Sequence, residues 1–98
     1  MITSKQRAYL RSMANDLTAI MQIGKNGLNE NLLKTVSDAL EARELIKLCV
    51  LENSGEEPKA VLNELCDALG AEPVGATGRK IILYRRSENK PTIELPTK

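Results

Sequence analysis

The pattern of apolar and polar residues along the chain predicts three helices, four short strands and a tail without periodicity. Apolar side chains spaced by three and four share one face of a helix, whereas short unbroken apolar runs are typical of strands that are covered on most of both faces. The predicted helices run from Thr3 or Ser4 to about Asn15, from Asn29 through Leu40, and from Pro58 to Leu69. The predicted strands cover residues 19–23, 45–51, about 72–75, and 80–85.

Residues at the helix ends support these boundaries. Asn29 is a good N-cap, and Glu30 brings a carboxylate to the positive end of the helix dipole. Pro58 suits the first position of a helix, and Gly70 supplies a stop that needs a left-handed backbone. The second and third helices are therefore predicted by their ends as well as by their apolar stripes.

The order of the elements, α-β-α-β-α-β-β, indicates the fold class. Two β-α-β crossovers, each expected to be right-handed, are followed by a closing hairpin. We therefore expect a small single domain of the α/β (α+β) class over residues 1–86, with a four-stranded mixed sheet layered with helices. Residues 87–98 contain two prolines and no periodic pattern, so we expect an extended or mobile tail.

Composition excludes several classes of function. The 98 residues include no histidine, phenylalanine or tryptophan, which removes histidine catalysis, histidine metal ligands and a paired aromatic platform for bases. Tyr84 alternates with Ile81 and Leu83 and is expected to pack rather than to stack on a base. Cys49 and Cys66 each lie in an apolar run and are expected to be buried free thiols in a reducing cytoplasm. No Walker or dinucleotide glycine motif and no long apolar segment is present. We therefore expect a soluble, cytoplasmic protein with no metal, cofactor, small-molecule substrate, membrane contact or enzymatic activity.

The net charge of +1 conceals an uneven distribution. Residues 1–28 carry +3, residues 29–74 carry −6 and residues 75–91 carry +4, while the last seven residues cancel. Basic ends around an acidic middle favour an anionic partner more than the total charge argues against one.

The first candidate site is Gly24-Lys25-Asn26-Gly27, which joins a predicted strand to a predicted helix. Glycines allow a ligand close to the backbone, the helix start offers unpaired N–H groups, and Lys25 adds a cation, all of which suit a phosphate or an RNA backbone. KH domains clamp nucleic-acid backbone with a Gly-x-x-Gly loop of this kind. The alternative is a tight turn that uses two glycines for its conformation alone, and the motif by itself slightly favours that turn.

The second candidate is the predicted hairpin, whose turn contains Gly75-Ala76-Thr77-Gly78. Glycines with positive φ explain such a turn. They do not explain why Arg79, Lys80, Arg85 and Arg86 bracket the short strand that follows. Solvated surface cations and an anion-binding surface remain equal alternatives here.

The first helix carries the third candidate set, Lys5, Arg7 and Arg11. Arg7 and Arg11 are four residues apart, so both can reach the same side of the helix, where like charges repel slightly. Contact with an anion outside the fold would relieve that repulsion, and solvation alone is the alternative.

Three spaced segments, residues 23–28, 44–47 and 78–85, resemble those of the CRM domain, the chloroplast RNA splicing and ribosome maturation module. The chain is most similar to its free-standing bacterial YhbY-type members, over about residues 1–86. The resemblance implies an RNA-binding domain related in fold to the C-terminal domain of translation initiation factor three. It also implies association with precursors of the large ribosomal subunit. Asn29 stands where the family often has threonine, and both residues cap helices well.

Together these observations predict a non-enzymatic RNA-binding protein that assists assembly of the large ribosomal subunit. It would contact the backbone of rRNA through its glycine turns and basic segments. The candidate residues are Gly24, Lys25, Asn26, Gly27, Gly78, Arg79, Lys80, Arg85, Arg86, Lys5, Arg7 and Arg11. The alternative is a protein-interaction module in which the acidic loop 52–57 and the third helix bind a basic ribosomal protein.

Overall fold

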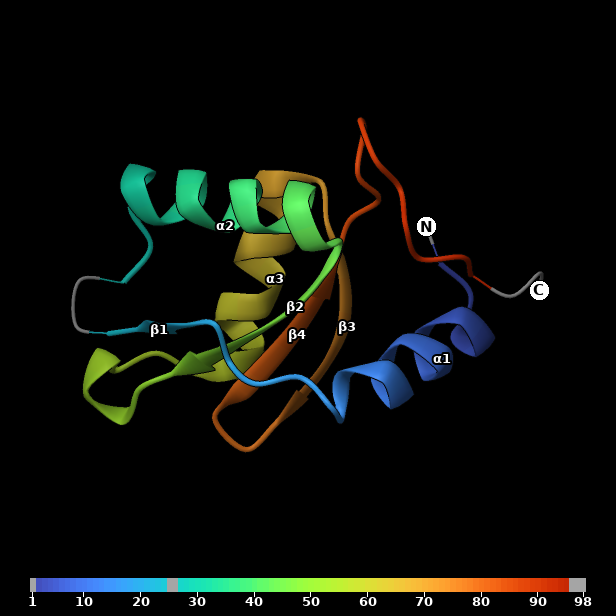
Figure 1. Ribbon diagram of the computed structural model, residues 1–98. Coiled ribbons are helices and arrows are strands. Elements are labelled where there is room, and N and C mark those ends of the chain that lie inside the picture. The colour runs from blue at the N-terminus through green and yellow to red at the C-terminus, as the bar shows by residue number, and fades with distance from the viewer. Residues whose placement is uncertain (1, 25–26, 96–98) are drawn as a thin grey trace.

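The computed structural model describes residues 2–24 and 27–95. Its elements follow the predicted order, with one short 3₁₀ helix added between the second strand and the third helix (Figure 1). The helices are α1 (Ser4–Ala14), α2 (Glu30–Arg43), the 3₁₀ helix η1 (Glu52–Ser54) and α3 (Pro58–Leu69). The strands are β1 (Met21–Ile23), β2 (Leu45–Val50), β3 (Glu72–Thr77) and β4 (Lys80–Tyr84).

The predicted capping and stop residues are confirmed, although α2 continues beyond Leu40 to Arg43. Thr3 forms a capping box with Gln6 at the start of α1. The Asn29 side chain accepts a 2.9 Å hydrogen bond from the Leu32 N–H at the start of α2. Gly70 ends α3 with a φ of 66°. The first strand is shorter than predicted, because β1 begins only at Met21, where pairing with β2 starts.

The strands form one mixed sheet in the order β1-β2-β4-β3. The outer strand β1 runs parallel to β2, whereas β4 is antiparallel to both β2 and β3. The closing strand is therefore inserted between β2 and β3, so β3 is an edge strand. A bulge between Pro73 and Gly75 interrupts its pairing with β4.

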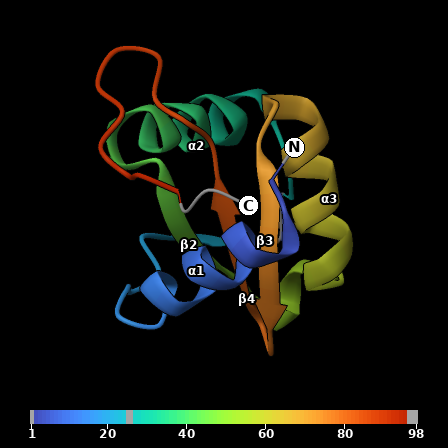
Figure 2. The ribbon, with the colours of Figure 1, turned by 90° about the vertical axis from the view of Figure 1, so that its right-hand side faces the viewer.

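Helices cover both faces of the sheet, with α2 and α3 on one face and α1 on the other (Figures 1 and 2). Alternate residues of the central strands supply two apolar cores. Ile46, Leu48, Ile81 and Leu83 pack under α2 and α3. The opposite core, under α1, contains Leu10, Ala14, Leu45, Val74, Ile82 and Tyr84. The predicted packing of Tyr84 is confirmed, since it is 5% exposed and lies on the face opposite Ile81 and Leu83.

The segment 87–95 contains no helix or strand, but it is bound to the end of α2. The buried carboxylate of Glu44 accepts hydrogen bonds from the backbone N–H groups of Ser87, Thr92 and Ile93 at 2.6–2.8 Å. Glu41 accepts a further bond from the Ser87 hydroxyl at 2.5 Å. Two glutamates of one helix thus attach a segment more than forty residues away in sequence.

Candidate nucleic-acid interface

The glycine turn lies between the end of β1 and the start of α2. The Gly27 N–H donates a 3.0 Å hydrogen bond to the Gly24 carbonyl, which closes the turn. Lys25 and Asn26, both predicted as site residues, lie outside the described residues. After the turn, Asn29 caps only one of the free N–H groups in the first turn of α2, so this helix start can still meet an anion.

The two glycines differ in what the fold requires of them. Gly27 has a φ of +63°, a conformation that side chains other than hydrogen rarely adopt. Gly24 does not have a positive φ, and a Cβ added to it would meet the Leu51 Cδ1 at 3.6 Å, an ordinary contact. Turn conformation therefore explains the glycine at position 27 but not the one at position 24.

The sheet brings the glycine turn and the β3–β4 hairpin to the same end of the sheet, where β1 and β2 finish and β4 begins. Leu51 connects them, because its N–H donates to the Ile23 carbonyl at 2.9 Å and its carbonyl accepts from the Arg79 guanidinium at 2.8 Å. Arg79 also donates to the Val50 carbonyl at 2.8 Å and to the Glu56 carbonyl at 3.2 Å. Arg79 is thus a clamp on the loop after β2 as well as a charge beside the glycine turn.

The turn of this hairpin leaves one cation fully available. Gly78 has the positive φ expected of a turn glycine, 59°. Lys80 follows with an exposed side chain. Beside them, the predicted acidic loop presents Glu52, Glu56 and Glu57 to solvent. The acidic loop borders a surface made of Gly24, Gly27, Gly78, Arg79 and Lys80, which we name the sheet-end surface.

Arg85 and Arg86 lie at the opposite end of β4, about 20 Å from Arg79 at the usual rise of a strand. Arg85 donates to the Leu69 carbonyl at 3.0 Å and to the Ser37 carbonyl at 2.9 Å, so it joins α2 to α3. Arg86 is exposed. The four cations that bracket β4 in sequence therefore form two separate pairs in space.

The cations of α1 form a third group. Arg7 Nε donates to the Pro73 carbonyl at 3.0 Å, and Arg11 Nη2 donates to the Val74 carbonyl at 3.1 Å. Both carbonyls belong to the edge strand β3. Gly75 permits this contact, since a Cβ there would lie 3.2 Å from Arg11 Nε. Gly75 does not have a positive φ, so the hairpin turn does not require a glycine there. The glycine instead allows the close approach of Arg11. Lys5, near the start of α1, is exposed.

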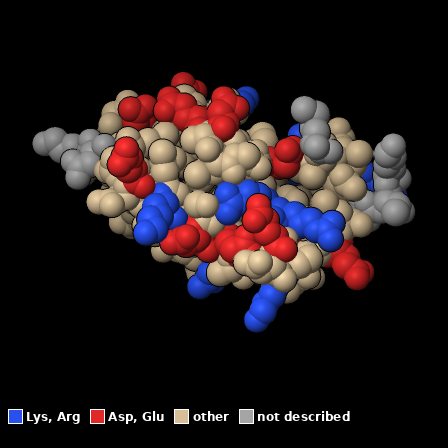
Figure 3. Space-filling model, turned by 90° about the horizontal axis from the view of Figure 1, so that it is seen from above, with Lys and Arg blue, Asp and Glu red and all other residues tan. Residues whose placement is uncertain are grey.

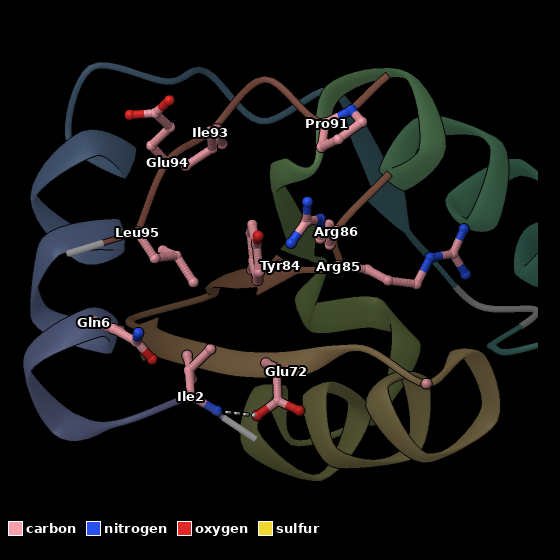
Figure 4. A pocket seen from close by; sticks show the side chains of 11 residues that line it. Ile2, Gln6, Glu72, Tyr84, Arg85, Arg86, Pro91, Ile93, Glu94 and Leu95 are labelled. Carbon is pink, nitrogen blue, oxygen red and sulfur yellow. Dashed lines mark hydrogen bonds between the residues drawn. The ribbon is translucent and has the colours of Figure 1, made fainter. Parts of the chain in front are cut away.

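A cleft of about 800 Å³ lies between the start of α1, the end of β4 and the segment 91–95 (Figure 4). Its lining mixes opposite charges, with Arg86 facing a cleft that also contains Glu72 and Glu94. The Glu72 carboxylate accepts a 3.2 Å hydrogen bond from the Ile2 N–H. A mixed lining of this kind does not favour a polyanion.

Acidic side chains are also prominent on the α2 side of the molecule (Figure 3). The face seen from the side of α2 carries several groups of acidic side chains with basic ones between them (Figure 3). Hydrogen bonds from Ser87, Glu88 and Asn89 lower the pKa of Glu41, which stays ionised near neutral pH. Cations lie beside the N–H groups of a helix start at the sheet-end surface, and they donate to backbone carbonyls in the α1–β3 region.

The chemistry available to a catalyst or a metal is limited. Burial, with help from Glu72 and Asp67, raises the pKa of Cys66 to about 12, so this thiol is a poor nucleophile. Within residues 2–24 and 27–95, no group of three or more Cys, Asp and Glu side chains is arranged to hold a metal ion. The helices in the same ranges are too short or too polar to cross a bilayer.

Comparison with known proteins finds relatives that are named as RNA-binding proteins. Residues 2–85 match the family model of the CRS1 / YhbY (CRM) domain. The chain is 45% identical over 96 residues to the probable RNA-binding protein YqeI of Bacillus subtilis, covering 98% of this chain and all of that one. It is 33% identical over 97 residues to an RNA-binding protein of Haemophilus influenzae, covering 99% and 97% of the two chains. Neither relative is named as an enzyme.

A solved structure supports the fold. The solution structure of the hypothetical protein SAV1595 from Staphylococcus aureus aligns with a TM-score of 0.78 and 42% sequence identity. The alignment covers 98% of this chain and all of the other. The predicted small α+β domain with three helices and a four-stranded mixed sheet is therefore confirmed.

Proposed function

Because the chain belongs to the CRS1 / YhbY (CRM) domain family, we propose that it binds RNA through the sheet-end surface, and that this RNA is rRNA in a precursor of the large ribosomal subunit. The observation that carries the proposal is Gly24. The fold does not need a glycine there, whereas a ligand that must reach the backbone does.

The surroundings of the glycine turn suit a phosphate. The start of α2 supplies N–H groups and the positive end of a helix dipole. Arg79 is held in place by three carbonyls, so ordering it on binding costs little, and Lys80 adds an exposed charge. Exposed carboxylates of the acidic loop repel a phosphate backbone from the far side of the hairpin, which limits how RNA can lie.

Recognition on this surface depends on backbone and shape. Tyr84 is buried, and Tyr9 on α1 is the one exposed ring in the described part of the chain, at 43% exposure. One ring cannot provide the successive stacking contacts by which single-stranded bases are held. We therefore expect affinity that falls steeply with salt and varies little with base sequence.

The experiment compares two glycine substitutions in an RNA-binding assay. Gly24→Ala is expected to keep the fold and to weaken binding of a short rRNA fragment about tenfold, since its methyl group blocks close approach. Gly70→Ala lies at the opposite end of the sheet and strains a φ of 66°, so it is expected to lower stability and leave affinity unchanged. Wild-type affinity in folded Gly24→Ala would contradict the proposed site.

The ribosomal part of the proposal needs a separate measurement in cells. Crosslinking followed by sequencing of the attached RNA is expected to recover large-subunit rRNA, and the protein is expected to co-sediment with cytoplasmic large-subunit precursors. Loss of co-sedimentation in Gly24→Ala would support the RNA contact. If co-sedimentation instead survives Gly24→Ala and is lost when Glu56 and Glu57 are both changed to lysine, the acidic loop binds a basic ribosomal protein.

A further inference from the structure

A groove of about 390 Å³ crosses the edge strand β3, between α1 and α3. Figure 2 shows these two helices on either side of β3. Three cations line the groove, Arg7 and Arg11 from α1 and Lys59 from the first turn of α3. No acidic side chain is among its lining residues. The groove is thus concave, its only charged lining residues are cations, and it is separate from the sheet-end surface.

The two arginines are already oriented for a ligand. Each guanidinium has five N–H donors, and contacts within the described chain use one of them, to Pro73 or to Val74. The bond to β3 holds each fork in place, so little side-chain entropy is lost when the remaining donors bind an anion. Four residues of helix separate the two forks by about 6 Å along its axis, close to the length of one nucleotide step.

The geometry points to a second RNA contact in this groove, in which Arg7, Arg11 and Lys59 bind successive phosphates of the backbone. This inference rests on the proposed function and extends it to a place that the glycine turn does not reach. RNA held at both places would wrap from the sheet-end surface onto the edge strand β3.

An added peptide strand does not fit the same edge. Strand addition needs free N–H and C=O groups along the edge. Pro73 has no N–H, the Pro73 and Val74 carbonyls already accept from arginines, and the bulge breaks the register there. The occupant is therefore held by side-chain cations, as a chain of phosphates would be.

The test uses Lys59, which can be changed without touching the arginine contacts. Lys59 and Lys90 are both exposed, and neither side chain has a hydrogen bond within the described residues. Lys59→Gln is expected to weaken binding of a fluorescein-labelled single-stranded RNA about three- to tenfold and to reduce the salt slope by about 0.7. Lys90→Gln removes the same charge from the tail and is expected to change neither quantity.

A second variant tests the oriented forks. Changing Arg7 and Arg11 together to lysine keeps the net charge but removes the planar forks, and RNA binding is expected to fall. Thermal melts of this variant show whether α1 stays docked. If it unfolds, the comparison of Lys59→Gln with Lys90→Gln still decides the question.

The outcomes separate this inference from the proposed function. A wild-type protein that binds no RNA overturns both. RNA binding that Gly24→Ala weakens, and that Lys59→Gln and Lys90→Gln leave alike, overturns the groove alone. A third outcome is that the wild type binds polyglutamate, and that Lys59→Gln abolishes this binding while it leaves RNA binding unaffected. The groove then holds an acidic protein segment, and the inference is wrong.

Discussion

Replacing Glu44 by glutamine tests whether a single buried carboxylate attaches the C-terminal segment. Glu44 is 1% exposed, and its carboxylate accepts four hydrogen bonds, three from backbone N–H groups and one from the Thr92 hydroxyl at 2.9 Å. Glutamine has nearly the same size, but its amide nitrogen would face an N–H donor that the carboxylate now satisfies.

The expected loss follows from these contacts. A hydrogen bond to a charged group contributes about 1.5–3 kcal/mol, and a buried donor left without a partner costs about 1–3 kcal/mol. We therefore expect Glu44→Gln to lower the free energy of unfolding by about 2–4 kcal/mol. For a domain of this size, even about 2 kcal/mol lowers Tm by about 8–16 °C. Thermal and urea denaturation followed by circular dichroism measures the loss.

The pH dependence gives a second check. Burial alone would raise the pKa of Glu44, but the hydrogen bonds from Ser87, Ile93 and Thr92 outweigh it and lower the pKa below its ordinary value of 4.5. A lowered folded-state pKa stabilises the protein above the unfolded pKa, and this contribution is lost as pH falls through the folded value. The wild type and Glu44→Gln should therefore differ most near neutral pH and converge in acid.

The control is Glu41→Gln, which changes a glutamate that contacts the same segment from a more exposed position. We expect a smaller loss of stability there, because water can replace the missing bonds. Fast amide hydrogen exchange at Thr92 and Ile93 in Glu44→Gln, with β4 still protected, would place the loss in the attached segment. An unchanged Tm for Glu44→Gln, or a difference that persists undiminished in acid, would refute the reasoning.

Three further predictions concern the sheet-end surface and the thiols. Arg79→Lys should lower the free energy of unfolding by about 1–2 kcal/mol in urea denaturation, because lysine cannot span the same carbonyls; an unchanged midpoint would show that the clamp is not needed. Gly27→Ala should cost about 1–2 kcal/mol through its left-handed φ, while Gly24→Ala should stay within about 0.5 kcal/mol, and equal losses in the same assay would contradict the distinction. Burial raises the pKa of Cys66 to about 12, so its thiol is protonated at pH 8, and iodoacetamide followed by peptide mass analysis should modify the less buried Cys49 first; modification of Cys66 at an equal rate would show that it is not buried.

Arginine has a dual role throughout this domain. Arg7, Arg11, Arg79 and Arg85 each donate to backbone carbonyls of neighbouring strands, loops or helices. These contacts strengthen the fold and also hold some of the guanidinium groups at the surface, where they are available to the proposed RNA ligand. Arg85, which joins α2 and α3, is mainly a structural residue, so its replacement is expected to affect the proposed RNA binding through the fold as well as through charge.

Local signals in the sequence determined the elements and the fold class. Apolar spacing, the Asn29 cap, Pro58 and the Gly70 stop each act within one or two helical turns, so they identify α2 and α3 directly. The alternation of Ile81, Ile82, Leu83 and Tyr84 likewise determined which face of β4 each side chain occupies, because a strand has a period of two.

Tertiary structure alone decided where the charges meet. The insertion of β4 between β2 and β3 placed Arg79 beside Gly24 and separated it from Arg85, although both arginines flank the same strand in sequence. It also made β3 an edge strand, whose Pro73 and Val74 carbonyls accept from Arg7 and Arg11 beside a groove that Lys59 also lines. No local pattern contains this information, because strand order depends on packing between segments tens of residues apart, and a charge shows its role only when its spatial neighbours are known.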